Sequence, residues 1–196
     1  MKRIFDIALS FLGLVFCIPF FAIIAIVIYL DDYRYPFFMQ YRVGQHGKLF
    51  KLIKFRSMSV NDISSNGTFE AGNLSRVTRI GKILRKTKVD ELPQLFNVLK
   101  GEMSFVGPRP EVKKWVSVYP ERWAIVLRVR PGITDYASIE FRSEEEILAK
   151  SENPEVTYRK IILPQKLTLN EQYVREQSFL LDLNIIFKTI RTLLIK

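Results

Sequence analysis

The sequence contains almost none of the side chains that bind soft metal ions. One cysteine, Cys17, and one histidine, His46, occur among its 196 residues. A single cysteine excludes an intrachain disulfide and a cysteine-based zinc site, and a single histidine excludes a histidine cluster within one chain. Any metal is therefore expected to be a hard cation held by oxygen atoms, for which Mg²⁺ is the first candidate.

Acidic residues are also scarce relative to basic ones. The chain has 20 aspartates and glutamates against 30 lysines and arginines, which gives a net charge of +10. This excess points to anionic partners: phosphates, nucleic acid or an acidic lipid surface. The sequence has no internal repeat and no low-complexity tract. Its length fits one domain, or one domain with an appendage, and is enough to bury a core.

Charge is rarest near the N-terminus. Between residues 4 and 30 the only charged side chain is Asp6, and Lys2 and Arg3 stand just before this apolar run. As a helix the run would be roughly 40 Å long, which is ample to cross a bilayer. It is too long for a cleaved signal peptide, and no small-residue cleavage site follows it. We therefore expect a membrane segment.

Pro19, near the middle of this run, leaves two membrane arrangements open. A proline inside a helix removes a main-chain hydrogen bond and kinks or breaks the helix. Either a kinked helix spans the bilayer, or a broken helix enters and returns to the same face. The basic N-terminus and the basic downstream chain favour the same side for both ends of the run, which only the second arrangement provides. Proline also occurs in many spanning helices, so these residues alone do not decide.

Residues 36–58 predict a β-hairpin in which aromatic and basic side chains interleave. Gly44 and Gly47 are turn signals between two segments rich in β-branched and aromatic residues. The second strand is expected to alternate its faces, with Phe50 and Leu52 on one and Lys51, Ile53 and Phe55 on the other. Such a surface suits nucleic acid or lipid headgroups, and after a membrane segment the lipid surface is the simpler interpretation. His46 is expected to be a loop residue without a chemical role, and the polar residues 61–75 an exposed loop.

The most informative stretch is residues 82–99. Four cationic side chains lead into the adjacent carboxylates Asp90 and Glu91: Lys82, Arg85, Lys86 and Lys88. A helical apolar pattern follows up to Leu99. We predict that Asp90 is the N-cap of this helix, with Pro93 in the first turn, which would place main-chain N–H groups where phosphate oxygens could bind. An ordinary capped helix after a basic face explains the same residues.

Arg109 stands between Pro108 and Pro110, after a short predicted strand at residues 103–106. Each proline fixes its own φ angle and biases the residue before it toward extended geometry. A guanidinium on such a stiff frame is preorganised to bind an oxyanion through two hydrogen bonds. A proline-rich turn with a solvated arginine is the alternative.

The remaining chain predicts mostly helices. Residues 112–130 read as helical with an interruption at Pro120, and residues 133–142 as extended. Ser143 and Glu146 fit a capping box, so Glu144 to Glu146 are expected to be helix-start acids rather than metal ligands. Pro154 is expected to begin a helical stretch that Pro164 breaks. The amphipathic run 179–196 could pack into the core or dock on a membrane surface, with its apolar side made of Leu180, Leu183, Ile186, Phe187, Ile190 and Leu194.

These motifs, taken in order, resemble the bacterial sugar transferases, also called monotopic phosphoglycosyl transferases. The resemblance covers nearly the whole chain. The pieces that carry it are Lys2-Arg-Ile-Phe-Asp6 with its proline-broken apolar run, Tyr41-Arg-Val-Gly44, Lys54-Phe-Arg-Ser-Met58, Arg79-Ile-Gly-Lys-Ile-Leu-Arg-Lys86, Asp90-Glu-Leu-Pro-Gln-Leu-Phe-Asn97, Met103-Ser-Phe-Val-Gly-Pro-Arg-Pro110 and Arg130-Pro-Gly-Ile-Thr134. Each is modest singly, and their order and spacing make the match specific.

The resemblance implies an enzyme that moves a sugar-1-phosphate from a UDP-sugar to a polyprenyl phosphate and releases UMP. The family's Asp-Glu pair matches Asp90, as the nucleophile that forms a phosphosugar-aspartyl intermediate, and Glu91, as a ligand of Mg²⁺. Arg85 matches an arginine that positions the polyprenyl phosphate. The same resemblance makes the remaining candidates ligands of the nucleotide or of phosphate: Pro108, Arg109 and Pro110, then Arg142, and more weakly Lys54 and Arg56.

The chain departs from the family pattern at two places. Many relatives have Gly-Trp-Ala-Gln-Val after Gly-Ile-Thr, where this chain has Asp135-Tyr-Ala-Ser-Ile139. This difference suggests a subgroup with another sugar preference. Relatives also carry aspartates around a downstream Tyr-Val-Asp, where this chain has Asn170 and Arg175, so acidic roles cannot be carried over to that region.

The expected fold is α/β, mostly helical with a small β element. Residues 1–32 would form a re-entrant membrane helix broken at Pro19, and residues 33–196 a catalytic domain with interfacial amphipathic helices on the cytoplasmic face of a bacterial inner membrane. The expected partners are a UDP-sugar, a polyprenyl phosphate and the bilayer, without nucleic acid; the sugar, the pathway and the oligomeric state, a homodimer included, are left open. The competing hypothesis is a non-catalytic, membrane-tethered basic module that binds anionic lipid or nucleic acid. Adjacent carboxylates inside the basic stretch argue against it, because a polyanion binder gains nothing from them.

Overall fold

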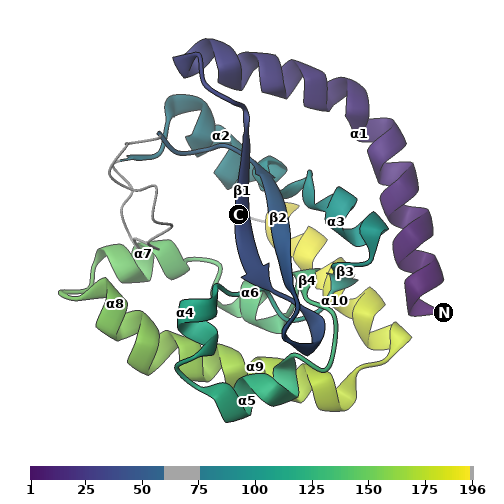
Figure 1. The fold of residues 1–196 in the computed structure, drawn as a ribbon, viewed down its shortest axis with the longest axis vertical. Helices are drawn as coiled ribbons and strands as arrows, with labels where there is room; N and C mark the ends of the chain where they lie inside the picture. Colours follow the sequence, from purple (N-terminus) through teal and green to yellow (C-terminus); the bar gives the residue numbers. More distant parts are fainter. Residues whose placement is uncertain (60–75, 195–196) are drawn as a thin grey trace. The chain divides into compact units, whose positions relative to one another are not determined.

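The computed structural model describes residues 1–59 and 76–194, so the loop predicted at residues 61–75 lies outside the described residues. These residues form two compact units, which are described separately. Unit 1 holds residues 1–40, 51–59 and 76–101, and unit 2 holds residues 41–50 and 102–194. The expectation of a mostly helical chain with small sheets and one long apolar N-terminal helix is confirmed (Figure 1).

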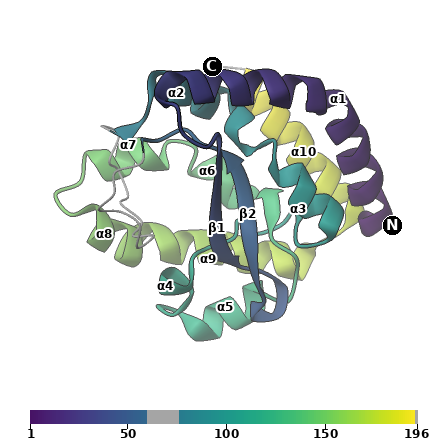
Figure 2. The same cartoon turned by 45° about the horizontal axis from the view of Figure 1, so that its top comes forward.

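Unit 1 begins with the long helix α1 (Lys2–Asp32), which contains Pro19 in its interior. Figures 1 and 2 show α1 as two limbs that meet at a bend, as a proline inside a helix predicts. The helix ends at Tyr33, whose left-handed conformation returns its N–H to the carbonyl of Tyr29 at 2.6 Å. Among the described residues, α1 is the one helix long and apolar enough to cross a membrane, with a mean hydropathy of 3.0 over its most apolar window.

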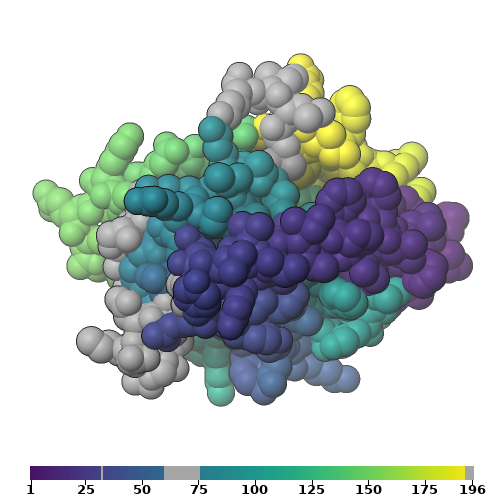
Figure 3. Space-filling model, turned by 90° about the horizontal axis from the view of Figure 1, so that it is seen from above, coloured from purple at the N-terminus to yellow at the C-terminus, as the bar shows by residue number. Residues whose placement is uncertain are grey.

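Most apolar side chains of α1 are exposed, and Figure 3 shows the helix open to view along one face. Its inner side packs against α3 (Gln94–Lys100). Gly13 allows this approach, because an added Cβ there would lie 3.2 Å from Leu95. Arg3 donates to the carbonyls of Val98 at 2.6 Å and Leu99 at 2.9 Å in the last turn of α3, where carbonyls have no partner one turn further along the helix.

The predicted hairpin is confirmed: β1 (Phe37–Val43) pairs with β2 (Leu49–Phe55) across the short helix η1 (Gln45–Gly47). His46 lies in this turn, as expected. Phe50 and Leu52 are buried while Lys51 is exposed, which confirms that part of the alternation. Phe55 was predicted on the face of Lys51 and is buried instead, because the rings of Phe21 and Phe37 each lie 5.3 Å from its own.

α2 (Arg79–Thr87) begins at Thr78, whose hydroxyl accepts the N–H of Gly81 at 2.9 Å. Gly81 is required by a close approach rather than by its backbone angle. A Cβ at this position would lie 2.0 Å from the carbonyl oxygen of Ser57. Thus α2 packs directly on the main chain that leaves β2, and it leads into η4 (Val89–Glu91) and α3.

Unit 2 is built around two short parallel strands, β3 (Ser104–Val106) and β4 (Gly132–Thr134). Ser104 pairs with Gly132, and Val106 with Thr134. Between them lie α4 (Lys113–Val116) and α5 (Pro120–Val126), which confirm the predicted interruption, since Pro120 occupies the first turn of α5. Trp115 of α4 and Trp123 of α5 are buried in the main core of the unit. The other buried members of this core are Val126, Leu148, Tyr158, Ile162, Leu163 and Leu167.

Three predictions for the second half of unit 2 are wrong in detail. The segment 133–142 is extended only to Thr134, because Asp135 then caps α6 (Tyr136–Glu140). Ser143 precedes α7 (Glu144–Ala149) without a side-chain cap bond, so there is no capping box. Pro164 does not break the helical stretch: α8 (Pro154–Thr157) passes through the π-helical turn η5 (Tyr158–Ile162) into α9 (Leu163–Glu176), and a proline is tolerated in the first turn of α9.

The last helix, α10 (Phe179–Leu194), turns an unexpected side inward. Its buried residues are Asp182 and Ile185, and the Asp182 carboxylate accepts the hydroxyl of Tyr173 at 2.7 Å. The alternative that the predicted apolar side of α10 packs into the core is therefore wrong for most of its residues. Ile186 packs partly against the core, whereas four other members are exposed: Leu180, Leu183, Phe187 and Ile190.

Candidate functional site

Asp90 and Glu91 are buried in unit 1, in the 3-10 turn η4 between α2 and α3. The prediction that Asp90 is an N-cap is wrong. Lys88 ends α2 in the left-handed conformation, and the N–H groups of Glu91 and Leu92 bond the carbonyls of Lys88 and Val89, each at 3.2 Å. The α-helix α3 starts only at Gln94, so the N–H groups next to the Asp90 position are used inside the turn.

Lys54 is the residue that the fold brings to this pair. Its ammonium lies 2.8 Å from Glu91 Oε1, and the two side chains are 18% and 9% exposed. Asn97 holds the two segments together, because its side chain accepts the Ile53 N–H at 3.1 Å and donates to the Lys51 carbonyl at 2.8 Å. Figures 1 and 2 both show α3 beside β2. The weak candidate Lys54 is thus a direct partner of Glu91.

The two other basic candidates of unit 1 have different surroundings. Arg85 is half-buried in the last turn of α2, the helix that contacts η4. Arg56 is buried just after the end of β2. Its guanidinium donates to the carbonyl of Arg34 at 3.2 Å, and its main-chain N–H donates to the carbonyl of Pro36 at 2.8 Å. Arg56 therefore ties the strand to the segment after α1, a structural use that the sequence did not indicate.

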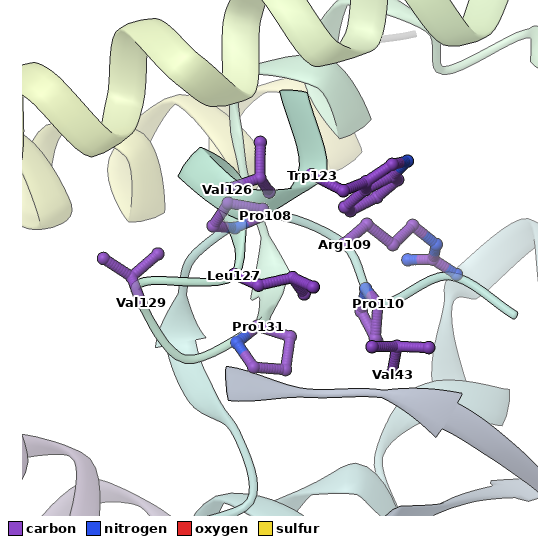
Figure 4. A pocket seen from close by; sticks show the side chains of 9 residues that line it. All are labelled: Val43, Pro108, Arg109, Pro110, Trp123, Val126, Leu127, Val129 and Pro131. Carbon is purple, nitrogen blue, oxygen red and sulfur yellow. The ribbon is translucent and has the colours of Figure 1, made fainter. Parts of the chain in front are cut away.

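Pro108, Arg109 and Pro110 belong to unit 2, where both prolines are buried and Arg109 is half-buried. They line a small pocket whose other walls are mainly apolar, among them Trp123 and Leu127. Figure 4 shows the guanidinium of Arg109 directed away from Pro108 and Leu127, toward the side of Pro110. Arg109 thus stands between two buried prolines, and the polar end of its side chain lies at the edge of the pocket.

Arg142 is exposed in unit 2, at the turn between α6 and α7, and donates to the carbonyl of Thr192 in α10. Of the positions where relatives carry acidic residues, Asn170 is buried in α9 and Arg175 is exposed near its end. The candidates thus divide between the units: Lys54, Arg56, Arg85, Asp90 and Glu91 in unit 1, and Pro108, Arg109, Pro110 and Arg142 in unit 2.

A buried polar network is centred on Glu111, the residue directly after Pro110. The sequence patterns did not predict this network. The Tyr158 hydroxyl donates to Glu111 Oε1, Lys166 lies 3.7 Å from the same oxygen, and Arg42 lies 3.4 Å from Oε2. Lys166 also donates to Glu144 at 3.0 Å, which confirms that this helix-start acid is engaged in a structural pair. Burial, and next the charge of Glu111, raise the pKa of Tyr158 well above its usual range, so the hydroxyl stays protonated and keeps donating.

A metal site would have to be built on Asp90 and Glu91. Among the described residues, no group of three or more His, Cys, Asp and Glu side chains could hold a metal ion. Two neighbouring carboxylates nevertheless fit Mg²⁺, which is commonly bound by one or two carboxylates, water and substrate phosphates rather than by a full protein cage. The ammonium of Lys54 on Glu91 means that a cation would share or replace that contact.

Comparison with known proteins identifies the relatives of the chain. The family described as bacterial sugar transferase matches residues 1–196. The chain is 34% identical over 99% of its length to a UDP-N-acetylgalactosamine-undecaprenyl-phosphate N-acetylgalactosaminephosphotransferase of Aeromonas hydrophila, covering 44% of that protein. It is 37% identical over 97% of its length to a UDP-glucose:undecaprenyl-phosphate glucose-1-phosphate transferase of Escherichia coli (strain K12), covering 39% of that protein.

A third relative is close to this chain in length. The uncharacterized sugar transferase EpsL of Bacillus subtilis (strain 168) is 36% identical over 100% of the chain, which covers 88% of that protein. The chain thus spans less than half of the first two relatives and most of the third. The two relatives named for a sugar differ in that sugar, so the matches leave the choice of sugar open.

Proposed function

The chain belongs to the bacterial sugar transferase family, and on this premise we propose that it transfers a sugar-1-phosphate from a UDP-sugar to undecaprenyl or another polyprenyl phosphate, with release of UMP. The names of two relatives contain both substrate classes. The observation that carries the proposal is the buried pair Asp90 and Glu91, with a lysine of a distant strand on Glu91. One lysine balances only one of the two adjacent carboxylates, and phosphoryl transfer uses both kinds of charge.

Asp90 acts as the nucleophile in this proposal. Its carboxylate oxygen attacks the phosphorus that bears the sugar, the bond from that phosphorus to the UMP oxygen breaks, and UMP leaves. An oxygen of the polyprenyl phosphate then attacks the same phosphorus. The bond to Asp90 breaks, and the carboxylate is restored as the polyprenyl diphosphate sugar forms. Two displacements at one phosphorus atom imply ping-pong kinetics.

Glu91 and Lys54 form a charged pair beside the proposed nucleophile, since Glu91 directly follows Asp90 in the chain. Glu91 supplies the carboxylate oxygens that would hold Mg²⁺, which when bound neutralises diphosphate charge. Lys54 holds the Glu91 side chain in place through the 2.8 Å contact. Asn97 supports the pair by fixing α3 to β2. The N–H groups of Glu91 and Leu92 take no part in this proposal, because they bond the carbonyls of Lys88 and Val89.

The assignment of the two substrates to arginines rests on the family motifs that contain these arginines. We assign the polyprenyl phosphate to Arg85, on the helix that leads into η4, and the nucleotide to Arg109 with Pro108 and Pro110. Arg56 and Arg142 keep secondary roles as phosphate ligands, since each guanidinium already donates to a main-chain carbonyl.

Membrane placement follows from α1. We propose that residues 1–32 form a re-entrant hairpin bent at Pro19, and that residues 33–196 form the catalytic domain on the cytoplasmic face of the bacterial inner membrane. The exposed apolar side chains of α10, with Lys188 and Arg191 on the same helix, support an interfacial role for it. Cysteine labelling at residues 2 and 33, in a Cys17→Ser background, tests the hairpin. Accessibility of both ends from the cytoplasmic side is expected, and accessibility from opposite sides would exclude the re-entrant arrangement.

The activity is tested with purified protein in detergent, Mg²⁺, a polyprenyl phosphate and a panel of UDP-sugars, with UMP as the readout. In the absence of polyprenyl phosphate, one UDP-sugar labelled at the sugar-bearing phosphate should transfer about one equivalent of label to the protein. If no UDP-sugar yields UMP while the protein still binds anionic vesicles, the non-catalytic module becomes the better hypothesis.

A further inference from the structure

The main chain around Arg109 is held by hydrogen bonds at almost every step. All of these bonds lie within unit 2. They run from Gly107 N to Thr134 O (3.0 Å), Gly132 N to Pro108 O (3.1 Å), Arg109 N to Asp135 Oδ2 (3.1 Å), Arg42 Nη1 to Pro110 O (3.2 Å) and Val43 N to Glu111 O (2.9 Å). Among these five hydrogen bonds, the one from the Arg109 N–H is the one whose acceptor is a side chain; the other four acceptors are main-chain carbonyls.

That acceptor is Asp135, which is fully buried at 0% exposure. One carboxylate oxygen accepts the N–H of Arg109 at 3.1 Å, and the other accepts the N–H of Ser138 at 2.6 Å. The same side chain therefore starts α6 and anchors Arg109. Bonds from N–H groups to an ionised carboxylate are stronger than bonds to a neutral acceptor, so this link is directional and stiff.

Asp135 is fully buried, so its side chain has no surface with which to touch a bound substrate. Its contacts instead point to Arg109.

We propose that Asp135 is a positioning residue for nucleotide binding, which fixes the Arg109 peptide and thereby the point on the main chain from which the guanidinium extends. This inference depends on the proposed function, because it takes Arg109 as the ligand of the nucleotide. The two prolines fix the φ angles on either side of Arg109, and the Asp135 bond fixes the remaining orientation of its peptide group. A residue held in this way binds with less loss of conformational freedom.

The test compares Asp135→Asn with the wild type. An amide can accept one of the two N–H groups but must turn its own NH₂ toward the other, so one bond to a charged acceptor is lost. In ping-pong kinetics, kcat/KM for each substrate reports its own half-reaction. We expect kcat/KM for the UDP-sugar to fall about tenfold, the scale of one such bond, and kcat/KM for the polyprenyl phosphate to stay within about twofold. UDP binding, measured by calorimetry, should weaken by the same factor.

Asn153→Ala is the matched control. Asn153 caps α8 through the Val156 N–H at 3.1 Å, in unit 2 but on an exposed surface, and should change stability without changing UDP binding. In an Arg109→Ala background, Asp135→Asn should add little further loss. A further tenfold loss there, or an equal fall for both substrates together with a lowered melting temperature, would refute a positioning role.

The proposal can fail separately from the proposed function. If Arg109→Ala leaves kcat/KM for the UDP-sugar and UDP binding unchanged, the assignment of the nucleotide to Arg109 is wrong, and the role of Asp135 is wrong with it. If Arg109→Ala weakens both while Asp135→Asn weakens neither, the nucleotide assignment stands and only the positioning role is overturned.

Discussion

The two groups of candidate residues are held in opposite ways. In unit 1, a salt bridge joins the buried carboxylate of Glu91 to Lys54, on a short 3-10 turn between two helices. In unit 2, hydrogen bonds hold the segment around Arg109 along its whole main chain, and the buried network of Glu111 follows directly. The contrast matches the work proposed for each. A reaction centre must exchange partners as charge moves, whereas a binding arginine gains from being fixed in advance.

The strongest test of this contrast is the removal of the proposed nucleophile. Asp90→Asn should lower UMP release at least about a thousandfold, because an amide cannot form the covalent intermediate. Membrane association, measured by flotation with vesicles, should be unchanged. Glu121→Gln, an exposed acid at the start of α5, serves as the matched control with normal activity. Substantial UMP release by the Asp90 variant would remove the nucleophile assignment.

The salt bridge of unit 1 should show the next largest effect. Lys54→Met removes the ammonium from the buried Glu91 carboxylate. A broken pair of this kind costs about 3 kcal/mol when both groups are well shielded, and somewhat less here because Lys54 keeps some solvent contact. We expect a lower melting temperature in detergent and a lower kcat, because the Glu91 side chain loses the contact that holds it in place.

The double variant Lys54→Met with Glu91→Gln separates stability from chemistry. It should recover much of the melting temperature, since no buried charge is left from the pair, but none of the activity. If the double variant is as unstable as Lys54→Met alone, then Lys54 stabilises the unit by packing and not through Glu91.

A smaller effect is expected in the network of unit 2. Tyr158→Phe removes the hydroxyl that donates to Glu111, which should cost about 1–3 kcal/mol because the acceptor is charged and buried. Tyr119→Phe is the control, since its hydroxyl donates to the Arg159 carbonyl on the surface. Thermal unfolding checks the difference between the two variants. Equal melting temperatures would show that the Glu111 network adds little to stability.

The smallest effect should come from Arg142. Its guanidinium is exposed and donates to the Thr192 carbonyl, so Arg142→Ala should change kcat/KM for the UDP-sugar less than about threefold. Arg109→Ala should lower the same quantity at least about tenfold. A loss for Arg142→Ala as large as that for Arg109→Ala would restore Arg142 as a main phosphate ligand.

Local patterns predicted the elements of this chain well where one signal dominated. The apolar run, the hairpin with its glycine turn and the helix start at Pro120 follow from hydrophobic spacing, turn residues and proline chemistry, and all are present. Predictions failed where two local signals competed. Asp90 is a residue type that is common at the N-cap, yet it lies in a 3-10 turn because Lys88 ends α2 in the left-handed conformation. In α10 the side with Asp182 is buried, because Tyr173 supplies a hydrogen-bond partner there.

The candidate site was predictable in its residue types and not in its contacts. Asp90, Glu91 and Arg109 became candidates because acidic and basic residues stand in unusual local settings, next to each other or between prolines. Lys54 was ranked low because nothing in a strand of alternating aromatic and basic residues marks one lysine over another. Asp135 and Glu111 were missed, although the spacing of Asp135 and Ser138 is that of an N-cap and the third residue after it.

The sequence by itself determined the family, the apolar first helix, the excess of positive charge and the adjacency of Asp90 and Glu91, because all of these are properties of neighbouring residues or of composition. Only the tertiary structure decided that Lys54 meets Glu91 across 37 positions, that Asp135 holds the N–H of Arg109 across 26, and which side of α10 is buried. These contacts join segments far apart in the chain, and their formation depends on how the whole core packs rather than on any local preference.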